Sequence, residues 1–126
     1  MATIDLTTEA FKKEIFDYTA SQEWSYTADV PAIIDFYADW CVDGVKLERT
    51  TFTHPEVVSY LKRAVVLQSD VTPNDDMDKE LMKHFGIIGP PAILFFGSDG
   101  NELKQYRLVG YSAPDKFMNH IKNALK

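Results

Sequence analysis

One cysteine in this chain of 126 residues could do covalent chemistry. Cys41 follows an apolar run, Val30 to Tyr37, at the point where a buried strand is expected to give way to a helix. Backbone N–H groups and the positive dipole end at a helix start favour the thiolate, which is the form of cysteine that attacks disulfides. The alternative is that Cys41 is a small buried hydrophobic residue, because free cysteine is among the most buried residue types.

A carboxyl group interrupts the same run. Asp35 is the only charged residue between Val30 and Tyr37. A lone carboxyl inside an apolar strand costs free energy unless it is hydrogen-bonded or protonated, so burial should raise its pKa. The alternative is a polar residue that is hydrogen-bonded at a strand end.

The other polar residues do not form ligand patterns. The three histidines fall on three different expected elements: His54, His84 and His120. The acidic residues between Asp75 and Asp78 crowd an expected helix start, but the glycine and distal glutamate of a calcium loop are missing. We therefore expect no metal site and no cofactor.

Composition limits the class of protein. A 45% hydrophobic content in 126 residues suits one core, so residues 1–126 are expected to form a single domain, and we expect a monomer. The net charge of −6 argues against nucleic acid and anionic lipid as partners. The apolar runs are too short to cross a bilayer, and no signal peptide is recognisable in the sequence. One cysteine cannot form an intramolecular disulfide.

Periodicity predicts alternating strands and helices. Five helices are expected. The first covers residues 10–18, the second begins after Cys41, and the third runs from a Thr53–Glu56 capping box to Lys62. The fourth runs from Thr72 to Phe85, and the last begins at Pro114. Residues 21–29 are expected to form a loop. The expected strands are residues 30–37, 64–67 and 92–96, with residues 103–109 as a hairpin partner of the last. This order predicts an α/β fold with a mixed sheet between helices.

Two motifs identify a family resemblance. The segments Asp35-Phe36-Tyr37-Ala38-Asp39-Trp40-Cys41 and Gly89-Pro90-Pro91-Ala92 resemble the thioredoxin superfamily. From Thr51 onward, stretches such as Asp70-Val71-Thr72 are similar to the C-terminal domains of bacterial thiol:disulfide interchange proteins of the DsbD type. The first forty residues are more similar to bacterial periplasmic thioredoxins, as in a chain of mixed ancestry or an engineered chimera. The resemblance implies a thioredoxin fold, a mixed central sheet with helices on both faces, and the bacterial periplasm.

The resemblance also implies roles for individual residues. Cys41 corresponds to the attacking thiol, with Trp40 beside it at the rim, and Asp35 to a buried carboxyl that exchanges protons with the site. Pro91 corresponds to a cis-proline that faces the thiol and offers backbone groups to an extended substrate. Gly89 and Pro90 precede it, and Pro90 departs from the family because proline has no N–H to donate.

The larger departure is the motif Cys41-Val42-Asp43-Gly44, in which glycine stands where the family has a second cysteine. Cys41 could then form a mixed disulfide with a thiol-bearing or disulfide-bearing protein but could not resolve it, so the adduct would wait for an external thiol such as glutathione. Asp43 adds a negative charge that opposes a thiolate. The rival hypotheses are a redox-inactive module that binds an extended peptide, and an engineered or decayed scaffold.

Overall fold

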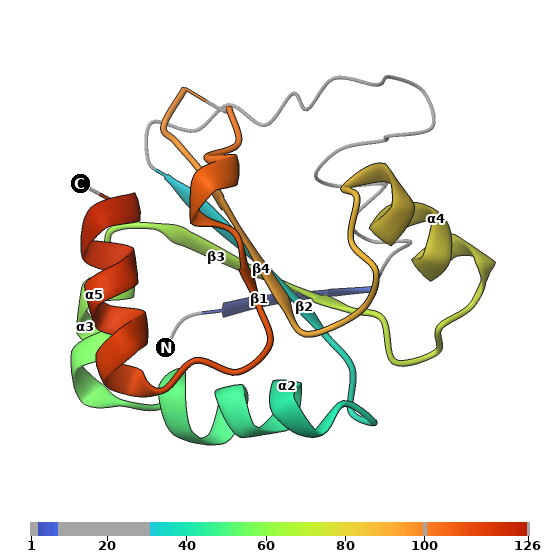
Figure 1. Cartoon of the computed structure of the whole chain (residues 1–126), viewed down its shortest axis with the longest axis horizontal. Helices are drawn as coiled ribbons and strands as arrows, with labels where there is room; N and C mark the ends of the chain where they lie inside the picture. Colours follow the sequence, from blue (N-terminus) through green and yellow to red (C-terminus); the bar gives the residue numbers. More distant parts are fainter. Residues whose placement is uncertain (1–2, 8–30, 100, 126) are drawn as a thin grey trace.

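The computed structural model describes residues 3–7, 31–99 and 101–125. Five strands form one sheet in the order β1-β3-β2-β4-β5 (Figure 1). β1 and β2 both pair in parallel with β3, whereas β4 is antiparallel to β2 and β5 is antiparallel to β4. The sheet is therefore mixed. The strands are β1 Thr3–Thr7, β2 Ala32–Tyr37, β3 Val65–Asp70, β4 Ala92–Phe96 and β5 Leu108–Val109.

Helical segments connect these strands. The helices are α2 Val42–Lys46, α3 Pro55–Leu61, α4 Asp76–His84 and α5 Pro114–Ala124. A π-helical segment, Leu47–Thr51, continues α2, and a short 3-10 turn, Lys104–Tyr106, lies between β4 and β5. Among the described residues, no helix has the length and apolar character needed to cross a membrane.

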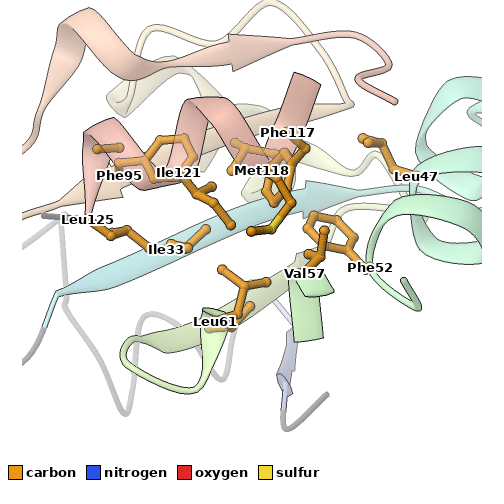
Figure 2. Packing of buried hydrophobic residues seen from close by; sticks show 13 residues of the cluster. Ile33, Leu47, Phe52, Val57, Leu61, Phe95, Phe117, Met118, Ile121 and Leu125 are labelled. Carbon is orange, nitrogen blue, oxygen red and sulfur yellow. The ribbon is translucent and has the colours of Figure 1, made fainter. Parts of the chain in front are cut away.

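Alternation along the strands divides the core into two layers. On one face, Ile34 and Phe36 of β2 pack with residues of α4 such as Leu81. On the other face, Ile33 packs with the π-helical segment, α3 and α5. Figure 2 shows two residues of this layer, Phe52 directly after the π-helical segment and Phe117 of α5. Their rings meet edge to face with centroids 5.4 Å apart. Helices cover both faces, which confirms the expected thioredoxin-type α/β fold.

The start of the chain differs from the expectation. β1 occupies residues that were expected to lead directly into a helix, and its Ile4 pairs with Leu67 of β3. The sequence of β1 alternates apolar and polar residues, which is a strand pattern, so the parallel pairing with β3 is the physical reason for the difference. The expected helix over residues 10–18 and the loop over 21–29 lie outside the described residues.

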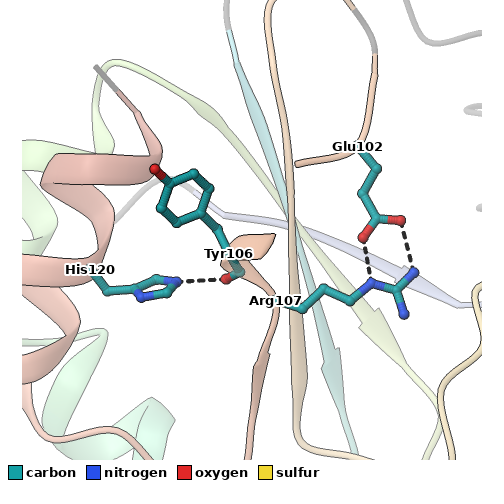
Figure 3. Close-up of polar contacts among 4 residues, drawn as sticks. All are labelled: Glu102, Tyr106, Arg107 and His120. Atoms are coloured by element: carbon teal, nitrogen blue, oxygen red, sulfur yellow. Dashed lines mark hydrogen bonds and ion pairs between the residues drawn. The ribbon is translucent and has the colours of Figure 1, made fainter. Parts of the chain in front are cut away.

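The expected hairpin partner of β4 is mostly not a strand. Within residues 103–109 only Leu108 and Val109 join the sheet, and a 3-10 turn occupies the middle. Two side-chain contacts accompany this turn (Figure 3): a ring nitrogen of His120 lies 2.6 Å from the Tyr106 carbonyl, and Arg107 forms a two-pronged ion pair with Glu102. These contacts and the turn's own backbone hydrogen bonds replace ladder pairing.

Helix starts also differ from the expectation. The predicted Thr53–Glu56 capping box is wrong, because His54 is the residue before α3 and Thr53 donates its hydroxyl to the Arg49 carbonyl at 2.7 Å. α4 begins at Asp76 and not near Thr72. A capping box between Asp75 and Asp78, in which each carboxyl accepts the other's backbone N–H, explains that start.

The remaining elements agree more closely with the sequence. β4 and α5 begin where expected, and β3 extends three residues further than the predicted strand, to Asp70. Gly86 follows α4 with a φ of 69°, a left-handed conformation that suits glycine at a helix end. Leu81 of α4 and Phe85 directly after this helix are buried, whereas Met77 in its first turn is 37% exposed.

Candidate functional site

The thiol lies at the corner between β2 and α2. Cys41 has extended backbone angles, φ −94° and ψ 108°, and is the residue immediately before α2. Its carbonyl accepts the N–H of Val45 at 3.0 Å, and its own N–H donates to the Ala38 carbonyl at 3.1 Å. The side chain is half-buried and packs against the core layer under α4. These backbone hydrogen bonds therefore fix the position of Cys41 between β2 and α2.

A proline bend faces this thiol from 49 residues further along the chain. The Cys41 Sγ donates to the Pro90 carbonyl at 3.3 Å. The Pro90–Pro91 peptide bond is cis. Pro91, the residue before β4, is buried, whereas Gly89 and Pro90 are partly exposed. The structure thus brings together the predicted thiol and the three predicted substrate-binding residues.

The position of the missing cysteine is buried beside the thiol. A Cβ atom added to Gly44 would lie 3.7 Å from each of three atoms, namely the Cβ and Sγ of Cys41 and the Cβ of Pro91. These are ordinary van der Waals distances, and a Cβ–Cβ separation of 3.7 Å falls in the range of about 3.5–4.5 Å found in disulfides. Position 44 therefore has the backbone placement for a disulfide with Cys41 but no sulfur.

The rim of the corner is apolar and acidic. Trp40 is 53% exposed, and its indole N–H donates to the Thr72 carbonyl at 2.8 Å. Val42 is 79% exposed, and Asp43 is exposed in the first turn of α2. The Trp40 ring is therefore tied to the loop after β3, which leaves much of its apolar surface open beside the thiol.

A buried carboxyl lies on β2, the strand that leads into the corner. Asp35 is 4% exposed and stands opposite Gln68 in the parallel register of β2 and β3. The Gln68 amide donates to Asp35 Oδ2 at 3.3 Å and also to Glu48 in the π-helical segment. Burial above all, and then the charge of Glu48, holds the pKa of Asp35 well above its ordinary value, while the hydrogen bond from Gln68 acts in the opposite direction. Asp35 therefore holds its proton more tightly than a solvated carboxyl.

Comparison with known proteins identifies the family to which this chain belongs. A family model described as a thioredoxin-like domain matches residues 20–125. This chain belongs to the thioredoxin-like family. Two curated relatives of this thioredoxin-like domain are named thiol:disulfide interchange protein DsbD. The protein from Cronobacter sakazakii is 42% identical over 96 residues, and the one from Escherichia coli K12 is 41% identical over 93 residues.

The matches cover different shares of each protein. The two curated relatives match over 76% and 74% of this thioredoxin-like chain, which spans only 17% and 16% of their own lengths. The oxidised DsbD C-terminal domain of Neisseria meningitidis has a TM-score of 0.72 and 29% identity over 98% of this chain and 99% of that one. Its reduced form gives a TM-score of 0.65, also at 29% identity, over 93% and 89% of the two chains. The chain is thus related to the interchange domain of DsbD.

Sequence reasoning missed two residues of this thioredoxin-like site, Gln68 and Glu48. A signal for Glu48 existed, because it lies four residues after Gly44 and seven after Cys41, a spacing that places residues on one helix face. Gln68 is the first polar residue of β3, after three apolar residues. The contact of Gln68 with Asp35 depends on the register of β2 against β3, which the sequence alone does not specify.

The arrangement offers a thiol after the end of β2 and a buried, proton-holding carboxyl on this strand. Among residues 3–7, 31–99 and 101–125, no three histidine, cysteine, aspartate or glutamate side chains are grouped as metal ligands. The described structure brings the Cys41 sulfur against the Pro90 carbonyl, and it joins the Asp35 carboxyl to Gln68 and Glu48 on the strand that leads into this corner. These groups suit thiol-disulfide exchange with proton transfer.

Proposed function

We propose that this domain carries out thiol-disulfide exchange through Cys41 alone. The Cys41 thiolate attacks one sulfur of a substrate disulfide, so that a mixed disulfide forms and the other substrate sulfur leaves as a thiolate. An external thiolate then attacks the mixed disulfide and releases Cys41. The observation that carries this proposal is the juxtaposition of the Cys41 sulfur, 3.3 Å from the Pro90 carbonyl, with a glycine at position 44.

The second half of the reaction needs a thiol from solution because no cysteine stands at position 44. Gly44 is buried beneath Cys41 and Pro91, so the external thiol reaches the mixed disulfide from the exposed rim. A small thiol such as glutathione suits this approach. The domain therefore accumulates a covalent adduct whenever such thiols are scarce.

Asp35 is proposed to exchange protons with the site. Its raised pKa makes it able to hold a proton at a pH where an exposed carboxyl is ionised. Glu48 and Gln68 are positioning residues in this proposal, because Gln68 donates to both Asp35 and Glu48, and the charge of Glu48 acts on Asp35. Trp40, Val42 and Asp43 form the rim that a substrate contacts.

The proline bend is proposed to bind the substrate chain. Pro90 cannot donate a backbone hydrogen bond, but its carbonyl accepts one, and the Cys41 S–H vacates that carbonyl when the thiol reacts. A substrate N–H can then take the place of the S–H. Pro90 thus offers the substrate chain a backbone acceptor and no donor.

The proposed setting is the bacterial periplasm, with disulfide-bearing or thiol-bearing proteins as partners and a monomeric single domain over residues 1–126. Relationship to DsbD over about three quarters of the chain supports the partner class. The net charge of −6 disfavours nucleic acid. The activity of the whole interchange protein is not assigned to this domain, which spans about one sixth of those relatives.

Adduct formation tests the proposal. The reduced chain is incubated with glutathione disulfide, and its mass is measured by mass spectrometry, with Cys41→Ser as the matched control. We expect one glutathione per chain, absent from the control and removed by dithiothreitol. A folded chain that gains no adduct, and whose Cys41 is alkylated no faster than free cysteine at any pH, would contradict the proposal.

A second candidate is a redox-inactive binding module. The exposed apolar surfaces of Trp40 and Val42 beside the proline bend favour it, because they could hold an extended peptide without covalent chemistry. Peptide binding that is unchanged by Cys41→Ser, together with no adduct, would support this module and exclude monothiol exchange.

A further inference from the structure

An apolar cavity lies beside the thiol corner. Its volume is about 140 Å³. Ala92 and Leu94 of β4 contribute its floor, and these side chains are on the face of the sheet that α4 covers. Cys41 and Ile87 pack against the same core layer, so the thiol and the cavity are on one side of the sheet.

Two lining residues connect the cavity to the proline bend. Gly89 lines the cavity and is bonded to Pro90, the residue whose carbonyl accepts from the Cys41 sulfur. Val109 also lines the cavity and pairs with Ala92, and the next residue, Gly110, donates its N–H to the Pro91 carbonyl at 3.0 Å. A chain bound at the thiol can therefore reach the cavity without leaving the surface.

The lining suits an aliphatic group. Ile88 and Val109 are 106% and 81% exposed, which is unusual for large apolar side chains, and both line the cavity. Arg107 also lines it, but both carboxylate oxygens of Glu102 hold its guanidinium (Figure 3). This ion pair offsets the charge and leaves a mainly apolar lining.

We propose that this cavity selects an aliphatic side chain two residues from the reactive cysteine of the polypeptide that joins Cys41. The inference rests on the proposed exchange function and names its substrate class. An extended chain advances about 7 Å in two residues and returns its side chain to the same face. Ile88, which lines the cavity, is two residues before Pro90 in this chain, with a bend at Gly89.

The volume limits the occupant to one side chain. An apolar cavity of about 150 Å³ holds a benzene-sized group, which is comparable to the side chain of leucine or isoleucine. A helix or a second domain would need a larger groove. The aliphatic group would also cover the exposed surfaces of Ile88 and Val109, which supplies the favourable transfer free energy.

Activated peptides test the proposal. Each probe carries one cysteine as a mixed disulfide with thionitrobenzoate, so that attack by Cys41 releases the coloured thiolate, and each has leucine, alanine or glutamate two residues before or after the cysteine. In one of the two directions we expect the leucine peptide to react about tenfold faster than the alanine peptide below saturation, and the glutamate peptide to react slowest.

Surface variants locate the effect. Ile88→Ser and Val109→Ser should reduce the preference for leucine to less than about twofold, because they remove the cavity walls. Met77→Ser is the matched control, since Met77 is a partly exposed apolar residue of α4 outside the cavity lining, and it should retain the tenfold preference. Urea unfolding of each variant checks that the fold is kept.

Three results would overturn the proposal. Equal rates for leucine and alanine peptides in both directions, with normal reaction of Cys41 toward glutathione disulfide, would remove the cavity's role and leave the exchange function intact. A Cys41 that reacts with neither peptide nor glutathione disulfide would overturn both. Self-association of the chain that Ile88→Ser abolishes would assign the cavity to a second copy.

Discussion

The surroundings of the buried carboxyl on β2 and the thiol corner that follows this strand differ in completeness. Asp35 has its polar partners in place through Gln68 and Glu48. Position 44 has a backbone that could place a second sulfur beside Cys41, yet it carries no side chain. The geometry of the corner therefore does not need the second cysteine, because strand register, the helix start and the proline bend set it.

Restoring that cysteine should produce the largest change. In Gly44→Cys the new Cβ lies 3.7 Å from the Cys41 Cβ, so we expect a disulfide between positions 41 and 44 and reduction of insulin with dithiothreitol as donor. An intramolecular thiol has a high effective concentration, so the rate should exceed that of the parent chain by about 100-fold or more. Gly44→Ser is the control, and two persistent free thiols under oxidising conditions would contradict the geometry.

Removing the buried carboxyl should change the pH dependence of stability. Because the pKa of Asp35 is raised in the folded chain, the native state binds this proton more tightly than the unfolded chain does. The resulting stability is present below the unfolded pKa and is lost as pH rises through the folded pKa. Asp35→Asn does not titrate, so it should increase the free energy of unfolding at pH 8 by about 1 kcal/mol or more.

Urea unfolding over a pH series measures this effect. The gain from Asp35→Asn should shrink as pH falls towards the ordinary aspartate range, because Asp35 is then protonated in both states. A constant difference between the two proteins at every pH would show that the carboxyl charge is not the cause.

Filling position 44 without a sulfur should have a smaller effect. An alanine Cβ there meets only ordinary contacts, and alanine is favoured over glycine inside a helix. Gly44→Ala should therefore stabilise the chain by about 0.5–1 kcal/mol in urea unfolding. Destabilisation would mean that the corner tolerates no side chain and would also undermine the disulfide expected for Gly44→Cys.

The smallest expected change concerns the second cause of the raised pKa. Glu48→Gln removes a negative charge next to Asp35 but leaves its burial, so the pKa of Asp35 should fall and remain above its ordinary value. The pH range over which stability is lost should then move downward. Glu56→Gln, an exposed glutamate at the start of α3, is the matched control and should leave that range unchanged.

The sequence predicts most of the fold because its strongest signals are local. β2 and β4 are continuous apolar runs, and Pro114 with the stripe of Phe117 and Ile121 defines α5. β1 was missed because five residues of alternating pattern at one edge are a weak signal. The hairpin prediction was wrong over residues 103–107 because a 3-10 turn occupies Lys104–Tyr106, and its Tyr106 carbonyl contacts His120 from a distant part of the sequence.

Some residues of the candidate site could likewise be predicted from the sequence, and others could not. Cys41, Asp35 and Pro91 are recognisable because short motifs carry them, and the structure places Cys41 beside the proline bend as expected. Gln68 and Glu48 meet Asp35 only after β3 pairs with β2 and the π-helical segment forms. The cavity beside Ile88 likewise depends on the packing of three separate segments.

The fate of a protein mixed disulfide tests the central claim most directly. The reduced chain is mixed with insulin in the absence of any other thiol and followed by non-reducing mass spectrometry. We predict a one-to-one covalent complex through Cys41 that persists until glutathione is added. Repeated separation of insulin chains without added thiol, or no complex with a folded and alkylatable chain, would contradict the claim.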